Sequence, residues 1–178
     1  TLMEDVYILV NANESTEIDL GDYNIDAVEG IKFSIGVEAP VNNQDPTLWP
    51  SDHPLAPKSP SMHWGWLSGY RFIAVEGMAG PGFGQMFQFH GLDNSNYFQT
   101  ELTLDAVPEN GVINIELDAD YTRALENIDV NSGVIVHGSD AEAKTALENF
   151  RDYVFSASGL TSTVDFSEIN DFKVFPNP

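Results

Sequence analysis

Short runs in which apolar and polar residues alternate dominate the first two thirds of the chain. Phe87 and Phe89, for example, alternate with Gln88 and His90. A period of two residues is typical of a strand with one buried face. The runs that show this or a short apolar pattern are residues 6–10, 30–37, 70–74, 87–90, 97–104 and 112–117. Because clusters of Gly, Pro, Asn and Asp separate them, we predict a mainly β fold, an antiparallel β-sandwich.

One or two short helices complete the predicted fold. Ser139 and Glu142 have the spacing of a helix-capping box. An apolar stripe with a helical period follows, made of Ala143, Ala146, Leu147, Phe150 and Val154. The pattern predicts a helix over residues 141–154, and a second, shorter helix over residues 118–126.

The charge balance limits the classes of partner. The 178 residues include 28 Asp and Glu but only 7 Lys and Arg, which gives a formal net charge of −21. A main role in nucleic-acid binding is excluded, because phosphate backbones require a basic surface, and docking on anionic lipid is disfavoured. The acidity favours solubility in a salty medium or the attraction of cations, including metal ions.

The sequence contains neither cysteine nor a long apolar run. There is no cysteine, which excludes disulfides and thiolate ligands and fits an exported bacterial protein. No apolar run reaches the roughly 18 residues that a membrane-spanning helix needs, so we expect no membrane span.

Histidine and tryptophan are concentrated around one segment. Residues 61–77 contain His63, Trp64 and Trp66, and a loop with six prolines between residues 39 and 61 carries His53. A long loop of this kind predicts an ordered functional loop. Neutral imidazole is a ligand for Cu, Zn, Ni and Fe. The alternative is that the indoles belong to the core and the histidines are ordinary hydrogen-bonded residues.

The second strong candidate histidine ends a predicted strand. If Phe87 and Phe89 face the core, His90 lies on the opposite face of the strand. It would then point to solvent or into the proline-rich loop. His137 is a further histidine for which a ligand role competes with a structural one.

Several motifs resemble one protein family. Val-Asn-Asn-Gln-Asp-Pro at 41–46, Ser-Met-His-Trp-Gly-Trp-Leu-Ser-Gly-Tyr-Arg-Phe at 61–72 and Phe-Gln-Phe-His-Gly at 87–91 are similar to motifs of the MbnP-like proteins. The resemblance covers roughly residues 25–155. It implies a bacterial periplasmic or surface protein associated with methanobactin and copper, often paired with a di-haem MauG-type oxidase.

The resemblance also implies a set of site residues. His53 and His90 match histidines of the family, and Trp64 and Trp66 match its tryptophans; His63 is the third candidate ligand. Copper would be the bound metal, in some members with a kynurenine made by oxidation of a tryptophan. The chain departs from the family at Asn43, where histidine is common, and lacks the four cysteines of one subgroup.

Calcium is a second possible cofactor. Asp22, Asn24 and Asp26 alternate as at the start of an EF-hand loop, but the sixth position is not glycine and Phe33 occupies the twelfth. An EF-hand is therefore excluded, and a looser calcium site in a loop stays open. No motif of a catalytic nucleophile is present, so we predict that the protein is not an enzyme.

The end of the chain differs in composition. Residues 156–171 are rich in Ser and Thr and predict a linker. Residues 172–178, Phe-Lys-Val-Phe-Pro-Asn-Pro, resemble the start of a type IX secretion sorting domain, which implies export to the cell surface. We therefore predict a domain over residues 1–155 and a linker with a sorting tail over 156–178. The alternative is that apolar residues at 166, 169, 172 and 175 dock on the sandwich.

The sequence thus favours a secreted metal-binding protein, with copper as the metal. The alternative is an extracellular carbohydrate- or protein-binding module in which Trp49, Trp64 and Trp66 form a stacking platform. A third possibility is a structural domain whose histidines are incidental.

Overall fold

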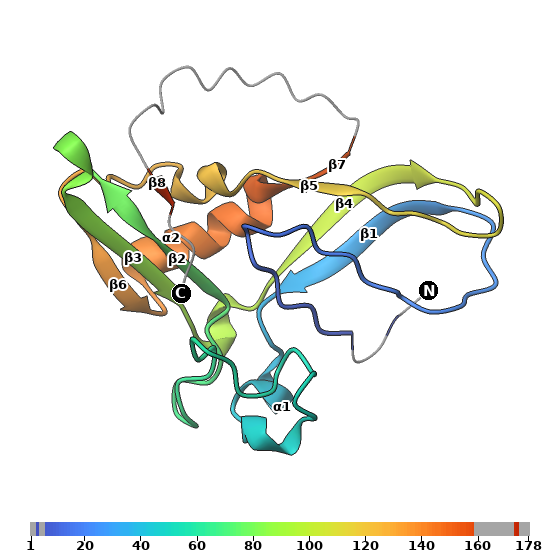
Figure 1. Ribbon diagram of the computed structural model, residues 1–178, viewed down its shortest axis with the longest axis horizontal. Coiled ribbons are helices and arrows are strands. Elements are labelled where there is room, and N and C mark those ends of the chain that lie inside the picture. The colour runs from blue at the N-terminus through green and yellow to red at the C-terminus, as the bar shows by residue number, and fades with distance from the viewer. Residues whose placement is uncertain (1–2, 4–5, 159–172, 175–178) are drawn as a thin grey trace.

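A four-stranded sheet lies on one side of the computed structural model, which describes residues 3, 6–158 and 173–174 (Figure 1, left). Its strands are β2 (Ile73–Ala79), β3 (Gln85–Gly91), β6 (Ile135–Gly138) and β8 (Lys173–Val174), in the order β6-β3-β2-β8. Two antiparallel pairs accompany it. They are β1 (Val28–Ile35) with β4 (Phe98–Ala106), and β5 (Leu117–Ala119) with β7 (Phe155–Ala157). The fold is mainly β, as predicted, with a sandwich-like arrangement of sheets.

Helical structure is sparse among the described residues. The α-helices are α1 (Ala39–Asn42) and α2 (Ala141–Asn149), and α2 continues into a π-helical turn, Phe150–Val154. Short 3-10 turns lie at Pro46–Leu48, Pro81–Phe83, Asn94–Asn96 and Tyr121–Leu125. The predicted helix over 141–154 is confirmed. None of the helices in the described part of the chain is long and apolar enough to cross a membrane.

Several local predictions were wrong. Residues 6–10 form no strand, because their apolar side chains do not alternate and remain largely exposed. The predicted strand at 112–117 begins only at Leu117, and the predicted helix at 118–126 is instead the end of β5 followed by a 3-10 turn. The capping box does not form, since Asp140 takes the N-cap position and makes no side-chain cap.

The pairing of β3 with β6 is the main topological departure from an antiparallel sheet. These strands run parallel, with His90 opposite His137 and Gly91 opposite Gly138. Helix α2 follows β6 directly and packs on β3. After β6 the chain therefore turns back across the sheet as α2, which covers the face of β3 that points to the core.

Strand β3 separates the core from the opposite face of the sheet. Phe87 and Phe89 are fully buried in the main core, together with Ala146 and Leu147 of α2. His90 projects from the other face, as the alternation predicts. It does not reach solvent, however, because the chain that follows the proline-rich loop covers it and leaves 4% of it exposed.

A second, smaller core holds the proline-rich loop in place. Val37, Leu55 and Tyr70 are its buried residues, and the Tyr70 hydroxyl donates a hydrogen bond of 2.6 Å to the carbonyl of Leu55. Buried Asn42 accepts a hydrogen bond from the backbone N–H of Tyr70 at 2.8 Å. The loop is thus ordered, as predicted, and it is attached to the segment that carries the tryptophans.

Of the C-terminal region after residue 155, the structure describes residues 156–158 and 173–174. The pairing of β7 with β5 extends to Ala157, and the backbone N–H of Ser158 bonds to Glu116. Regular pairing therefore continues two residues into the predicted linker. Lys173 and Val174 pair with β2, whereas 159–172 and 175–178, with most of the linker and sorting motif, lie outside the described residues.

Gly91 provides a test of the packing between β3 and α2. A Cβ atom at this position would overlap the Leu147 side chain, which is itself fully buried. We expect Gly91→Ala to lower the free energy of unfolding by about 1–3 kcal/mol through overpacking. For a domain of this size, the melting temperature falls by roughly 2–4 °C per kcal/mol.

Gly84→Ala is the matched control, because its φ is −88° and the nearest atom to an added Cβ is 3.5 Å away. It should change the stability by less than about 0.5 kcal/mol. Equal stability of the two variants in thermal unfolding would contradict this packing.

Candidate metal centre

Two histidines lie side by side on the face of the four-stranded sheet that points away from the core. His90 ends β3 and His137 lies on β6, and the parallel register makes them direct neighbours. Their rings are stacked, with centroids 4.0 Å apart and planes 10° apart. His90 is buried and His137 is exposed, so the pair connects the interior of the site to solvent.

Trp64 covers both imidazoles edge-on. Its ring centroid lies 4.9 Å from that of His90 and 5.1 Å from that of His137. A tight turn holds it there, since the Trp64 N–H bonds to Gly69 at 2.9 Å and the Gly69 N–H bonds to Gly65 at 2.8 Å. Gly65 has a φ of +87°, which a residue with a side chain would adopt only with strain.

Glu76 and Arg71 complete the surroundings of His90. Glu76 lies diagonally across from His90 on β2, and its Oε1 is 2.5 Å from His90 Nε2. Arg71 Nη1 lies 3.3 Å from the same nitrogen, and the guanidinium also lies over the Trp64 ring at 5.3 Å. Arg71 is 6% exposed and donates a further hydrogen bond to the carbonyl of Ser61.

Burial dominates the electrostatics of this cluster. It lowers the pKa of His90, although the hydrogen bond with Glu76 acts in the opposite direction, and His137 and Arg71 lower it further. It also lowers the pKa of Arg71. The imidazole of His90 is therefore held in the neutral form, which is the form that binds metal ions.

Two buried nitrogens of this cluster, Nδ1 of His90 and Nε of Arg71, have no hydrogen-bond partner within the described part of the protein. Nδ1 of His90 is inaccessible to solvent and makes no hydrogen bond within the described part of the protein. Buried polar atoms are nearly always paired, because an unpaired one costs free energy of about 1–3 kcal/mol. Nδ1 of His90 is thus an unused donor or acceptor beside a second imidazole, whereas the Arg71 Nε can only donate and offers no lone pair to a metal ion.

His53, the first predicted ligand, lies in a different group of rings. It stacks on Trp49, with centroids 4.2 Å apart, and its edge meets Tyr7 at 5.7 Å. Its Nδ1 accepts a hydrogen bond of 3.1 Å from the backbone N–H of Leu55. Its ring contacts in the described chain do not include His90, so the structure does not bring these two predicted ligands together.

His63 lies close in sequence to Trp64 but has its own neighbours. Its ring meets the edge of Tyr70 at 4.7 Å, and its Nδ1 accepts a hydrogen bond from the Gly65 N–H at 3.2 Å. Burial lowers its pKa, and the charge of Asp45 opposes this effect. The backbone of Gln44 also acts to raise this pKa. Nε2 is buried and makes no close hydrogen bond among the described residues, which leaves His63 a separate candidate ligand.

The three tryptophans do not form one platform. Trp49 is half-buried against His53, and Trp64 contacts the His90–His137 pair. Trp66 is 77% exposed at the tip of the turn, next to Leu67, which is 98% exposed. A stacking surface for a sugar would require these rings to lie together.

Sequence reasoning left out most of the partners of His90. His137 was considered, but only the parallel β3–β6 pairing places it beside His90. Glu76 was not singled out, although the alternation from Ala74 places it on the same face as His90. Arg71 could have been suspected as one of only seven basic residues, next to the Gly69-Tyr70 motif.

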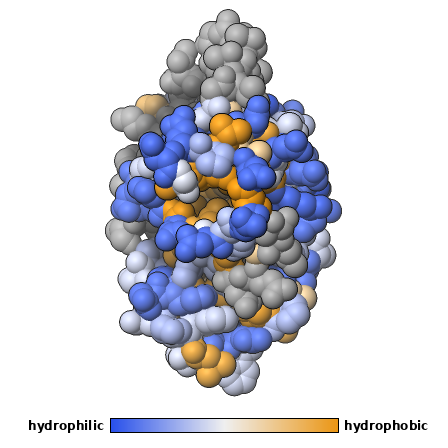
Figure 2. Space-filling model, turned by 90° about the vertical axis from the view of Figure 1, so that its right-hand side faces the viewer, coloured by the Kyte–Doolittle hydropathy of each residue, from blue (hydrophilic) through white to orange (hydrophobic). Residues whose placement is uncertain are grey.

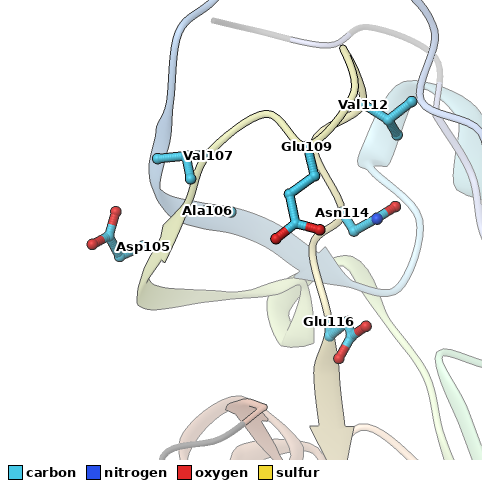
Figure 3. Close-up of a pocket in the computed structure, with 7 residues that line it drawn as sticks. All are labelled: Asp105, Ala106, Val107, Glu109, Val112, Asn114 and Glu116. Atoms are coloured by element: carbon cyan, nitrogen blue, oxygen red, sulfur yellow. The ribbon is translucent and has the colours of Figure 1, made fainter.

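Acidic residues line a pocket elsewhere in the molecule. Its volume is about 290 Å³, and it lies between the end of β4 and the segment before β5 (Figure 3). Its lining consists of Asp105, Ala106, Val107, Glu109, Val112, Asn114 and Glu116. Figure 3 shows Glu109 and Asn114 near each other and the Asp105 carboxylate turned away.

This pocket gives no support for the predicted calcium site. Across residues 3, 6–158 and 173–174, no three His, Asp or Glu side chains are grouped as a metal ion requires. The same finding means that the His90–His137 pair is a partial ligand set.

Figure 2 shows a hollow with apolar residues inside and hydrophilic residues around it on one side of the molecule.

Comparison with known proteins identifies one relationship. The model of the MbnP family matches residues 2–140. This range contains all four histidines, Trp64, Trp66, Arg71 and Glu76. No curated protein and no solved structure matches the chain.

Asn42 gives a test of how the turn that carries Trp64 is held. Its Oδ1 accepts from the Tyr70 N–H, and its Nδ2 donates to Asn94 Oδ1 at 2.9 Å. Asn42→Ala leaves a buried N–H unpaired, so we expect a loss of about 1–3 kcal/mol in the free energy of unfolding. Tryptophan fluorescence should shift to longer wavelength as Trp64 becomes more exposed.

The neighbouring Asn43→Ala variant is the control. Asn43 is exposed, and its side-chain amide donates a hydrogen bond to the carbonyl of Trp66 at 2.7 Å. Its removal should cost less than about 0.5 kcal/mol. If denaturant unfolding gives the two variants equal stability, Asn42 does not hold this turn.

Proposed function

The chain belongs to the MbnP family, and on this basis we propose that it is a secreted or cell-surface protein that binds copper through His90 and His137. The observation that carries the proposal is the buried Nδ1 of His90, which has no hydrogen-bond partner among the described residues and lies beside a second imidazole. Copper associates with the family as a whole. The residues that hold it in this chain are our proposal.

The donor set suits copper. Imidazole nitrogen is a good ligand for both Cu(I) and Cu(II), and the chain offers no thiolate that would favour other soft sites. Copper bound here would supply redox chemistry or serve as a transported ion. The neutral form of His90, maintained by burial, is ready to bind without losing a proton.

A single ion held by both imidazoles would require a rearrangement of the stacked pair. The lone pair of an imidazole lies in the plane of its ring, so two stacked rings direct their lone pairs in parallel rather than toward one ion. His137 is exposed, whereas His90 is fixed by Glu76 and Trp64. We therefore expect His137 to turn and the ring stack to open when the metal binds.

The electrostatic environment supports capture of cations. The formal net charge of −21 creates a negative potential around the molecule, which raises the local concentration of metal ions. Arg71 places one positive charge beside the site, and the Glu76 carboxylate at His90 balances it.

The larger ligand set suggested by the resemblance is still to be tested. His53 and His63 remain predicted ligands, and each has a ring nitrogen that already accepts a backbone hydrogen bond. A metal at either histidine would therefore use the other nitrogen. Comparison of single variants separates these sites from the His90–His137 pair.

Trp64 is the tryptophan that we propose for oxidative modification. Its ring contacts both imidazoles, whereas Trp66 projects into solvent. A kynurenine at position 64 would add an aromatic amine next to the histidines. The conversion opens the pyrrole ring, takes up O2 and water and releases the C2 carbon as formate, so it would need a partner that activates oxygen, for which a di-haem MauG-type oxidase is the candidate that the family resemblance provides.

A second candidate function rests on the exposed tip of the Trp64 turn. Trp66 and Leu67 present apolar surface that no described part of the chain covers. This arrangement favours docking of another protein, without a metal. Copper binding that persists when Trp66 is removed, together with loss of a protein contact, would assign the two roles to different residues.

The first prediction concerns copper content. After incubation with copper and dialysis, elemental analysis should find about one ion per wild-type chain and a strong loss in His90→Ala and in His137→Ala. Trp66→Ala is the matched control and should retain the ion, because Trp66 projects into solvent. His53→Ala tests the separate prediction of a ligand at His53; it should leave the ion at the pair in place, because the ring contacts of His53 are with Trp49 and Tyr7. Wild-type copper content in the His90→Ala, His137→Ala double variant would refute the proposed site.

The second prediction concerns the modified residue. In protein isolated from its natural host, peptide mass spectrometry should locate any kynurenine at Trp64 and leave Trp66 and Trp49 unmodified. The reason is that Trp64 alone of the three contacts the His90–His137 pair. Kynurenine at Trp66 with intact Trp64 would show that the exposed ring, rather than the one beside the histidines, is the target.

A further inference from the structure

Glu76 and Arg71 both lie next to Nε2 of His90, but they favour opposite protonation states of this nitrogen. Nε2 lies 2.5 Å from Glu76 Oε1 and 3.3 Å from Arg71 Nη1. A carboxylate can only accept a hydrogen bond, and a guanidinium can only donate one. Nε2 therefore bonds to Glu76 if it carries the proton, and to Arg71 if it carries the lone pair.

The distances decide between these two forms. A separation of 2.5 Å between nitrogen and a carboxylate oxygen requires a proton between them, since two lone pairs would repel at that range. The separation of 3.3 Å to Arg71 is longer than an ordinary hydrogen bond. The proton of the neutral ring is therefore on Nε2, and the lone pair is on Nδ1.

The consequence concerns the atom that is left without a partner. Nδ1 of His90 is buried, makes no hydrogen bond to any described residue, and in this tautomer has an available lone pair. Burial lowers the pKa of His90, as do His137 and the Arg71 guanidinium, and together they outweigh the hydrogen bond and charge of Glu76, which favour a second proton on the ring. A buried lone pair beside a second imidazole is a place where a metal cation can bind.

We propose that Glu76 is a positioning residue that fixes the Nε2–H tautomer of His90, so that Nδ1 is the atom that binds the metal. The proposal rests on the proposed function. Glu76 does not contact the metal itself. Metal-binding histidines commonly donate their other ring N–H to a carboxylate, which fixes the ring and increases its basicity.

Because Arg71 also lies next to Nε2, it determines which tautomer His90 should adopt when Glu76 is removed. Without Glu76, Arg71 would be the remaining partner of Nε2, and a donor there stabilises the lone pair on Nε2. The proton would then move to Nδ1, and the ligand atom would be blocked. Loss of Glu76 should therefore reverse the tautomer rather than only loosen the ring.

The first measurement uses the unaltered, metal-free protein. Long-range ¹H–¹⁵N NMR correlations of the imidazole ring distinguish a protonated from an unprotonated nitrogen. We expect His90 to show a protonated Nε2 and an unprotonated Nδ1. The opposite assignment would overturn the proposal without any variant.

The second measurement compares variants in copper titrations. Glu76→Met should show the reversed tautomer in the metal-free state and an affinity lower by about 10–100-fold. Glu76→Gln keeps an oxygen that can accept from Nε2–H, so it should retain the tautomer and most of the affinity. The Arg71→Met, Glu76→Met double variant removes the opposing donor and should bind copper more tightly than Glu76→Met alone.

Glu101→Met is the matched control, because it removes the same charge from an exposed residue of β4. It should leave both the tautomer and the affinity unchanged. A Glu76→Met protein with the wild-type tautomer would overturn the proposal, as would an equal loss of affinity in Glu101→Met. If Glu76→Met does not fold, the wild-type spectrum and the Glu76→Gln variant still decide.

The outcomes separate this proposal from the proposed function. Copper binding that requires His90 but is unaffected by Glu76→Met and Glu76→Gln would retain the function and reject the role of Glu76. A wild-type protein with the expected tautomer that takes up no copper would reject the function and the metal-binding half of this proposal. A Glu76→Met protein that loses affinity with its tautomer unchanged would make Glu76 a direct ligand, and the positioning role would be wrong.

Discussion

The parallel pairing of β3 with β6 is the constraint on which the rest of the molecule depends. It places His137 beside His90 on one face of the sheet, and it leads the chain into α2 on the other face. Leu147 of α2 then packs against β3 at Gly91, one residue after His90. The same strand therefore supports the core with Phe87 and Phe89 and the candidate metal centre with His90.

In the candidate metal centre, one positive and one negative side chain lie next to the buried His90. The Arg71 guanidinium and the Glu76 carboxylate meet at His90, and Trp64 covers the group from the side of the proline-rich loop. Charges in such a position cost free energy unless they are paired. Their retention next to a neutral imidazole with an unpaired nitrogen distinguishes this face from an ordinary polar surface of a sheet.

Local sequence patterns predicted individual strands and helices better than they predicted which residues lie next to one another in the fold. The alternation at Phe87 and Phe89 gave the buried face of β3 correctly, and the apolar stripe gave α2. The ligand pair of His53 and His90 came from a resemblance, and the fold places them among different rings. His137 joins His90 only through a parallel register, which depends on contacts between residues 47 positions apart and leaves no local signal. The tail lies mostly outside the described residues, so its linker and sorting roles remain predictions.

The most direct test of the central claim is the electron paramagnetic resonance spectrum of the Cu(II)-loaded protein, with ¹⁵N-labelled histidine to identify the ligands. Nitrogen hyperfine coupling should report two imidazoles in the wild type and in His53→Ala. It should report the loss of one imidazole in His90→Ala and in His137→Ala. A spectrum that is unchanged in both of these variants, or that loses an imidazole only in His53→Ala, would contradict a copper site at the β3–β6 pair.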